Sequence, residues 1–566
     1  MVSAFRDGVG MYLRTTQRKN RDGSIVRYVQ LAHNRRVEGV TQAEVLVNLG
    51  REDRLDTDGL GRLVASINRY LGEPDAGDQR VESGDGLSVV SSRPMGVAWL
   101  LDGLWSQLGV DTALAEVLGK RKFTTDVERV LFALVANRAI EPSSKLAAAE
   151  WASNDVAIEG LEVMDEDQAY RAMDLLVEAD TDAAVQEAVF FAVADLLNLE
   201  VDLLFFDTTS TYFETEHIDD LRRHGKSKDS RPDLPQIVIG LAVTREGIPV
   251  RCWVWPGNTN DQSILPEVKD GLRGWRLGRV VTVVDRGLSS DANLDYLRRA
   301  GGHWIAGEKM RDGTSDVEAV LSRQGRYQQV RDNLRVKEVR LDNETGKRWI
   351  LCHNPYEAER DRNQRDAALA RVAEELERID TARARDRTKK RRQSDEVHAK
   401  AECALRDHPS LGRWVRQLKS GRLRIDTAKV RAEQRLDGKF LLSTSDPDLS
   451  AEDVALGYKN LLEAERGFRD MKSTLDLRPV FHRIEPRIRS HVLLCWLALL
   501  LIRVAERRTA MTWRRIATEL GRVHAVTLTS PAGTVVQTTP LNTVQQGIVD
   551  ACGVAAPPRI THLHPG

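Results

Sequence analysis

Short segments of alternating apolar and polar residues come first along the chain. Residues 25–31 (Ile-Val-Arg-Tyr-Val-Gln-Leu) and 44–50 (Glu-Val-Leu-Val-Asn-Leu-Gly) have the period of half-buried strands. The stretch is rich in arginine, and Gly and Asp are enriched from residue 72 to 88, which is typical of a linker. This pattern predicts a small β-rich, basic N-terminal module with a linker over residues 1–90.

Apolar positions recur at helical spacing from about residue 95 to 200, for example in Val127–Val135. The run Pro142-Ser-Ser-Lys145 between two such stretches predicts a helix start. We therefore expect a helical domain over residues 91–200. Two roles remain open for it, a helix-turn-helix that binds DNA and helical packing without DNA contact, and the pattern favours the second.

Strand-like segments follow, at residues 203–206, 237–243, 250–255 and 280–284, with a helix-like segment at 264–272. Such a mixture predicts an α/β domain, a mixed sheet covered by helices. A charged helical pattern then runs from 357 to 400, a returning strand covers 440–445, and a helical stretch covers 458–472. About 180 residues separate the two parts of this domain, far more than a connection requires. We expect a core formed by residues 201–306 and 446–508, an insertion domain at 307–445, and a C-terminal segment at 509–566 whose role the sequence does not reveal.

Composition adds few constraints. The 566 residues are 41% hydrophobic and 30% charged, and 83 Lys and Arg against 84 Asp and Glu give a net charge of -1, so any affinity for nucleic acid has to come from local patches. Five scattered cysteines form no CxxC pair, which predicts neither a zinc cluster nor a disulfide framework and favours a reducing cytoplasm. The apolar run Val492–Ile502 is about half of a membrane span, so we expect a buried helix and no membrane association.

Three carboxylates stand in positions where an ionised group is costly. Asp207 follows the apolar run 201–206, Asp285 follows the apolar run 280–284, and Glu465 lies in the helical stretch 458–472. Acidic residues at strand ends lie where open sheets place ligands, and a divalent cation would compensate all three charges. Each acid also has an ordinary structural explanation: Asp207 as the cap of a turn, Asp285 as the N-cap of a helix at 289–297, and Glu465 in a salt bridge with Arg469.

The third acid lies in a seven-residue repeat. Tyr458, Glu465 and Lys472 would share one stripe of a single helix, because seven residues make nearly two turns. Leu461, Phe468 and Leu475 form a neighbouring apolar stripe, which places Glu465 at the edge of the core.

The order of the acids and the motifs around them resemble the DDE transposases of bacterial insertion sequences, and specifically the insertion-sequence-four superfamily. That superfamily has a Tyr, Arg, Glu, Lys pattern on its third-acid helix, and here Leu461 replaces the Arg. Residues 225–236, 257–261, 478–482 and 487–491 carry further resemblance. It implies a ribonuclease-H-like catalytic core with a large insertion domain.

The resemblance also implies a chemistry. Asp207, Asp285 and Glu465 would hold two Mg²⁺ ions, or Mn²⁺, about 3.5 to 4 Å apart, with Asp207 bridging them. Tyr458 and Lys472 would contact a DNA phosphate near the scissile bond. Basic patches at 222–228, 389–392 and 413–435 are candidates for further DNA contacts. As individual DNA-binding side chains we expect Lys226, Lys228, Arg231, Arg469 and Arg478.

The expected function is that of a transposase that binds the terminal inverted repeats of its element and carries out Mg²⁺-dependent strand cleavage and strand transfer. Bringing two DNA ends and target DNA together implies a homodimer in the synaptic complex, in the cytoplasm and at the nucleoid. Two alternatives remain open: a ribonuclease-H-like endonuclease without strand transfer, and a catalytically decayed protein that only binds DNA.

Overall fold

The computed structural model describes residues 11–19, 25–37, 40–52, 55, 87–118, 126–180, 183–199, 201–275, 277, 279–311, 313–341, 346–388 and 395–565. The chain divides into two compact units. The first contains residues 1–92, 526–537 and 560–566, and the second contains residues 93–525 and 538–559. Most of the predicted linker and the basic run Lys389–Arg392 lie outside the described residues.

The first unit is built mainly of two sheets. Strands β1 (Met11–Lys19), β2 (Ile25–Val37) and β3 (Val40–Arg51) form a three-stranded sheet, which confirms the predicted β-rich module. A four-stranded sheet has the order β18-β17-β16-β4. Its strands are β4 (Ser88–Pro94), β16 (His524–Ser530), β17 (Gly533–Thr538) and β18 (Ile560–Pro565), so the C-terminal segment shares a sheet with residues near 90.

The second unit begins with the predicted helices. They are α2 (Gly96–Gln107), α3 (Val110–Leu118), α4 (Val127–Ile140), α5 (Lys145–Asn154), α6 (Glu166–Ala179) and α7 (Ala184–Leu196). The predicted start at Pro142–Lys145 is confirmed, because the Ser144 side chain accepts a hydrogen bond from the Ala147 amide and caps α5. Two further helices, α17 (Trp513–Leu520) and α18 (Thr543–Ala551), belong to this unit.

Helix α16 (Glu485–Thr509) packs against α4 and α6 and contains the apolar run Val492–Ile502, all of which is buried as expected. It is long and apolar enough to cross a membrane by length and composition, and 94% of its most apolar stretch is buried inside the protein. A core helix of a soluble protein passes the same test, so this helix gives little reason to expect a membrane span.

A nine-stranded sheet forms the centre of the second unit, in the order β10-β11-β12-β15-β9-β8-β5-β6-β7. Its strands are β5 (Leu203–Tyr212), β6 (Gln236–Thr244), β7 (Pro249–Pro256), β8 (Val281–Val284), β9 (His303–Glu308), β10 (Gln328–Arg331), β11 (Leu334–Arg340), β12 (Arg348–His353) and β15 (Lys439–Thr444). Strand β8 runs parallel to β5 and β9, and the other pairs are antiparallel. The predicted mixed sheet is confirmed.

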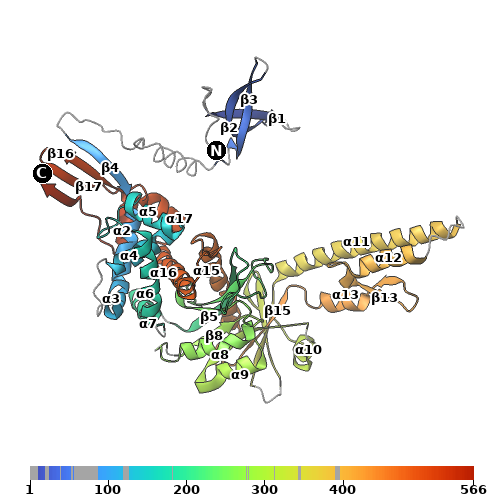
Figure 1. Cartoon of the computed structure of the whole chain (residues 1–566). Helices are drawn as coiled ribbons and strands as arrows, with labels where there is room; N and C mark the ends of the chain where they lie inside the picture. The colour runs from blue at the N-terminus through green and yellow to red at the C-terminus, as the bar shows by residue number, and fades with distance from the viewer. Residues whose placement is uncertain are drawn as a thin grey trace. The chain divides into compact units, whose positions relative to one another are not determined.

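Helices cover both faces of this sheet (Figure 1). Leu204 and Phe206 of β5 belong to a buried apolar cluster with residues of α8 (Asp261–Gly271) and α9 (Asp291–Arg298). Strand side chains alternate in direction, so Phe205 and Asp207 face the opposite side. There α15 (Leu462–Ser473) packs on β5 and β6, while α14 (Ala451–Lys459) packs on β8 and β9.

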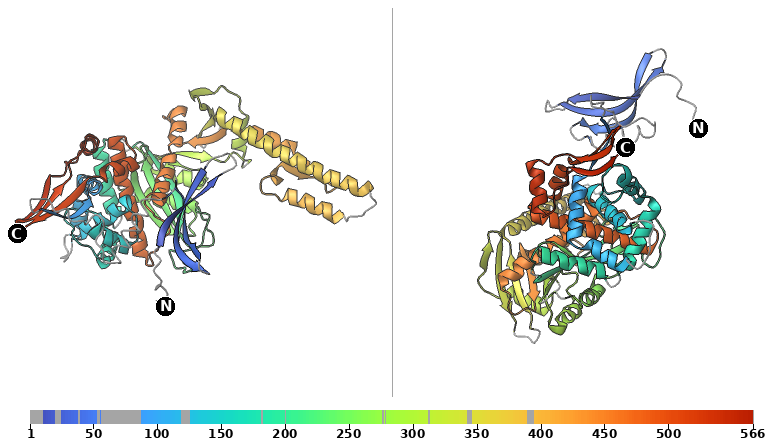
Figure 2. Two further views of the ribbon diagram at one scale, coloured as in Figure 1. Left: turned by 90° about the horizontal axis from the view of Figure 1, so that it is seen from above. Right: turned by 90° about the vertical axis from the view of Figure 1, so that its left-hand side faces the viewer.

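The expected insertion is divided between the sheet and an arm. Strands β10 to β12 and β15 extend the central sheet, and α10 (Ser315–Ser322) lies among them in sequence. The remainder, residues 354–438, forms what we call the arm. It contains α11 (Pro355–Thr388), α12 (Asp395–Arg406), β13 (Val415–Gln417), β14 (Leu423–Ile425) and α13 (Thr427–Gln434), and α11 points away from the sheet (Figure 2).

Candidate functional site

The strand register brings two of the three predicted acids together. Strands β5 and β8 are parallel, with Phe206 opposite Val284 as their last aligned pair. Asp207 and Asp285 are the next residues along the two segments, the first still within β5 and the second just after the end of β8, and the charge of Asp285 acts on Asp207, so the two carboxylates lie close together. Directly paired residues of a parallel ladder point to the same face, which is the face covered by α14 and α15.

Asp207 lies within β5, so the expectation that it ends a strand is wrong. The strand continues to Tyr212 because it remains paired with β6, where Asp207 stands opposite Leu241. Burial raises the pKa of Asp207 to about 6, against the lowering effect of Lys228 and of the hydrogen bond from the Thr208 amide. The charges of Asp285 and Glu465 raise this pKa further, so the three carboxylates interact electrostatically.

Glu465 lies in the first turn of α15, above β5 and β6. Its neighbours Ala464 and Phe468 are buried, and Glu465 itself is exposed, which places it at the edge of the core. Gly467 lets the helix approach the sheet closely, since a Cβ at this position would lie 2.9 Å from Cδ2 of Leu241. Leu241 is the β6 residue opposite Asp207, so this contact sets the helix directly over the first acid.

The single helix expected for Tyr458, Glu465 and Lys472 is wrong. Helix α14 ends at Lys459 and α15 begins at Leu462. The amides of Asn460 and Leu461 donate to carbonyls three residues back, so a tight turn interrupts the helix. Leu461 is 6% exposed at this turn, and Phe468 and Leu475 are buried as the apolar stripe predicts.

Tyr458 contacts a carboxylate of the site. Its hydroxyl donates to Oδ1 of Asp285 at 2.9 Å. Burial and the charge of Asp285 raise the pKa of Tyr458, so the hydroxyl keeps its proton and remains a donor. The ring lies against Gly307 of β9, where a Cβ would be 2.9 Å from Cζ.

The ordinary explanations of the acids do not describe this structure. Asp207 lies in a strand and caps no turn. Helix α9 begins at Asp291 with Ser290 at its N-cap, so Asp285 is not a helix cap. In the part of the chain that the structure describes, Glu465 and Arg469 form no ion pair.

A cavity of about 880 Å³ opens beside Asp285. Lys226, Lys228 and Arg286 line it, together with Lys309 and Arg311, and Asp207 and Glu465 are not part of its lining. Of these cations Arg311 is paired with Glu433, whereas Lys226, Arg286 and Lys309 are exposed and form no ion pair among the described residues. The cavity therefore presents uncompensated positive charge next to an acid of the site.

The other side chains predicted to bind DNA have different surroundings. Lys472 and Arg478 both pair with Asp229, and Lys472 is 10% exposed. Arg231 pairs with Asp233 and lies over the Tyr212 ring. Arg469 is exposed on α15.

Sequence reasoning missed Arg286 and Lys309. Both follow the ends of parallel strands, β8 and β9, whose carboxyl ends meet at one edge of the sheet. That rule, applied beyond the acids, would have found them. The sequence patterns also gave no sign of Asp229 and Asp261, because the partners of both are distant in sequence. Asp261, for example, accepts a hydrogen bond from Thr208 at 2.8 Å.

The donor set fits a divalent cation by its chemistry. Three interacting carboxylates supply the hard oxygen ligands that Mg²⁺ prefers, and a cation would offset both causes of the raised pKa of Asp207, its burial and the charges of Asp285 and Glu465. Among the described residues, no three His, Cys, Asp or Glu side chains form a compact metal-binding group.

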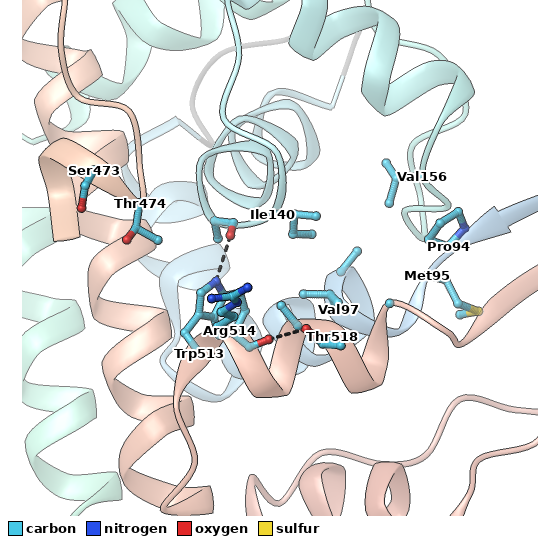
Figure 3. Close-up of a pocket in the computed structure, with 14 residues that line it drawn as sticks. Pro94, Met95, Val97, Ile140, Val156, Ser473, Thr474, Trp513, Arg514 and Thr518 are labelled. Carbon is cyan, nitrogen blue, oxygen red and sulfur yellow. Dashed lines mark hydrogen bonds between the residues drawn. The ribbon is translucent and has the colours of Figure 1, made fainter. Parts of the chain in front are cut away.

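A second cavity, of about 620 Å³, lies beyond the C-terminal end of α15 (Figure 3). Its lining is mainly apolar, with Met95, Val97 and Ile140 on one side and Trp513 and Arg514 on the other. The Trp513 indole donates to the Ala139 carbonyl at 2.9 Å, so its polar atom is already paired. None of the three acids lines this cavity, which is distinct from the candidate site.

Comparison with protein families decides the class. A family model described as "Transposase DDE domain" matches residues 202–501, which run from the start of β5 into α16 and include all three acids. A second, "IS1634 family transposase, N-terminal domain", matches residues 13–80. The chain belongs to the DDE transposases.

A DDE transposase domain implies a phosphoryl-transfer enzyme, a ribonuclease-H-like core and a role in DNA transposition. A search of curated proteins finds no match to this transposase. Among solved structures it is similar to the piggyBac transposase in a cryo-EM synaptic complex with hairpin DNA, at 11% identity and a TM-score of 0.34, over 75% of this chain and 78% of that chain. This likeness is too low to support a conclusion.

Proposed function

We propose that this transposase binds the terminal inverted repeats of its own insertion sequence and moves it by Mg²⁺-dependent strand cleavage and strand transfer. The observation that supports this most directly is the register of β5 and β8, which sets Asp207 beside Asp285 beneath the helix of Glu465. We further propose that the transposase is a divergent member of the insertion-sequence-four superfamily. Leu461 is buried at a helix break, which accounts for an apolar residue where that superfamily has Arg.

The three acids would hold Mg²⁺, which supplies charge stabilisation for phosphodiester cleavage when it is bound. The residues of the chain then have separate tasks. Asp207 and Asp285 are fixed by the sheet, Tyr458 fixes the orientation of the Asp285 carboxylate, and Glu465 approaches from α15. Outer hydrogen bonds of this kind orient metal ligands.

The DNA backbone would lie along the 880 Å³ cavity, where the exposed Lys226, Arg286 and Lys309 meet phosphates. Arg231 and Arg469, which do not line the cavity, remain proposed DNA contacts. Two DNA ends, target DNA and a homodimer would form the synaptic complex, in the cytoplasm at the nucleoid.

Activity on DNA ends tests this function. Duplexes that carry the two ends of the element surrounding the reading frame should be nicked and then joined to a target plasmid in the presence of Mg²⁺. We expect Asp207→Asn, Asp285→Asn and Glu465→Gln each to lower cleavage by at least about 10³-fold with little change in DNA affinity, because each removes a reacting-centre carboxylate.

The products distinguish the alternatives. Nicking without joined products would support an endonuclease without strand transfer. Binding of the ends without any Mg²⁺-dependent nicking would support a decayed protein, and retention of cleavage by Asp207→Asn would contradict the assignment of the acids.

A further inference from the structure

One buried carboxylate holds two of the side chains that the sequence assigned to DNA. The side chain of Asp229 is 3% exposed, and its Oδ1 accepts from Nζ of Lys472 at 2.7 Å and from the guanidinium of Arg478. Its other carboxylate oxygen, Oδ2, is buried and has no hydrogen-bond partner among the described residues. A buried carboxylate requires such partners, so the Lys472 and Arg478 cations are committed to Asp229.

Lys228, the residue before Asp229, contacts strand β5. Nζ of Lys228 donates to the Thr208 carbonyl at 2.7 Å and lies 3.5 Å from Oδ2 of Asp261. The Lys228 amide donates to Oγ of Ser210 at 2.8 Å. Thr208 and Ser210 are the first and third residues after Asp207 in β5, so Lys228 connects the loop to the strand of the first acid.

We propose that the 225–236 loop is a strap that fixes the helix of Glu465 against the strand of Asp207, with Asp229 as its positioning residue. Lys472 and Arg478 act through Asp229 and make no phosphate contact of their own. This inference rests on the proposed function, because the position of Glu465 matters only for its part in cleavage.

The geometry of α15 shows why such a strap is needed. Glu465 is exposed and forms no ion pair in the described part of the chain, so its location depends on how the whole helix is held. The close contact of Gly467 with Leu241 fixes one point of the helix. Lys472 lies in the last turn, about 10 Å along the axis from Glu465, and its bond to Asp229 fixes a second point. Two fixed points prevent the helix from pivoting over the sheet.

A direct contact between Lys472 and a DNA phosphate conflicts with the burial of this side chain and with its 2.7 Å bond to Asp229. To reach DNA, the ammonium of Lys472 would have to leave Asp229 and expose a side chain that is 90% covered. It would also leave Asp229 with Arg478 alone. Removing one partner from a buried carboxylate leaves part of its charge uncompensated, and a single phosphate contact in a solvated groove does not offset that loss.

The test separates cleavage from binding. Wild type, Asp229→Ala, Lys472→Ala and the double variant are compared for DNA affinity, for the salt dependence of that affinity, and for the single-turnover rate of Mg²⁺-dependent nicking. The DNA probe is a duplex carrying one end of the element. Asp167→Asn, which breaks an exposed ion pair with Arg171 on α6, is the matched control. Circular dichroism and thermal unfolding confirm that each variant folds.

We expect each single variant to nick about 10- to 100-fold more slowly, with affinity and salt slope unchanged, and the double variant to be no slower than the slower single. Asp229→Glu should recover part of the rate.

Opposite results would overturn the strap. A Lys472→Ala protein with weaker DNA binding and a salt slope lower by about 0.9 would show a direct phosphate contact, and additive losses in the double variant would show independent roles. If the wild type nicks neither end, the proposed function fails first, independently of the strap.

Discussion

The carboxylates of the site repel one another when no metal ion is bound. Asp207 and Asp285 are held side by side by the backbone, and the charge of Asp285 raises the pKa of Asp207. Residues selected for chemistry therefore lower the stability of the fold that holds them.

Replacing Asp207 with Asn should stabilise the metal-free protein at neutral pH. The folded-state pKa of about 6 lies above the ordinary value of 3.8, so the native state binds more protons between these values and stability falls as pH rises from about 4 to 6. Because Asp207 is partly exposed, we expect a gain of about 1–2 kcal/mol for Asp207→Asn at pH 7.5 and almost none at pH 4. Urea unfolding in EDTA measures the difference, and equal gains at both pH values would contradict it.

His482 should make stability fall in mild acid. Burial and the nearby Lys145 and Arg138 cations lower its pKa to about 3, below the ordinary 6.5, so the unfolded chain binds more protons between these values. Stability is then lost as pH falls below about 6.5, by about 1 kcal/mol at pH 5.5. We expect His482→Gln to reduce the loss when urea unfolding at pH 7.5 and 5.5 is compared, while the buried His491 beside it, whose pKa burial also lowers, keeps its own contribution. The control is His217→Gln, an exposed histidine, and an undiminished loss in His482→Gln would be the contrary result.

At the scale of elements, sequence patterns gave the strands and helices of the core but not their exact joints. Alternation and apolar runs predicted β5 to β8, since a buried strand requires them, and the seven-residue spacing predicted helices around Glu465. The break at Asn460 left no signal, because both flanking segments have helical composition. Nor did spacing reveal that Tyr458 meets Asp285 or that Lys472 meets Asp229, since these partners are 173 and 243 residues apart. Tertiary packing alone decides such pairs.

The contact between β9 and α14 offers a prediction. A Cβ at Gly307 would overlap the Tyr458 ring, so Gly307→Ala should displace the hydroxyl from Asp285. Losing an outer hydrogen bond to a metal ligand should slow nicking about 10- to 100-fold without weakening DNA binding. Tyr458→Phe should have a similar effect, and the two changes together should not add.

Gly547→Ala on α18 is the control, because nothing lies within 4 Å of its Cβ position and activity should be unchanged. If Tyr458→Phe weakened DNA binding while nicking of bound DNA stayed normal, Tyr458 would contact phosphate instead.

For the whole chain, the sequence predicted the order of its parts, but it did not show that strands of the expected insertion extend the central sheet. The hydrophobic patterns of β11, β12 and β15 are those of any buried strand, and pairing between strands far apart in sequence is set by the complete fold. Only the arm leaves the sheet. It departs and returns at one point, where the Asn354 amide donates to the Gly438 carbonyl at 2.7 Å and His353 pairs with Lys439.

This geometry predicts that the arm is dispensable for folding and contributes to DNA binding. Strands β12 and β15 are already an antiparallel pair, so an Asn-Gly turn in place of residues 354–438 should leave the sheet folded, with a thermal midpoint within a few degrees of wild type.

The β13–β14 region carries four exposed cations without ion pairs among the described residues, Arg416, Lys419, Arg422 and Arg424. Each phosphate contact that these cations make in the wild type should lower the salt slope of DNA affinity by about 0.9 when it is lost. Changing these four cations to Gln in the intact arm should lower the salt slope of DNA affinity as much as deleting the arm does. An unchanged salt slope in both the deletion and the Gln variant would show that DNA does not contact the arm.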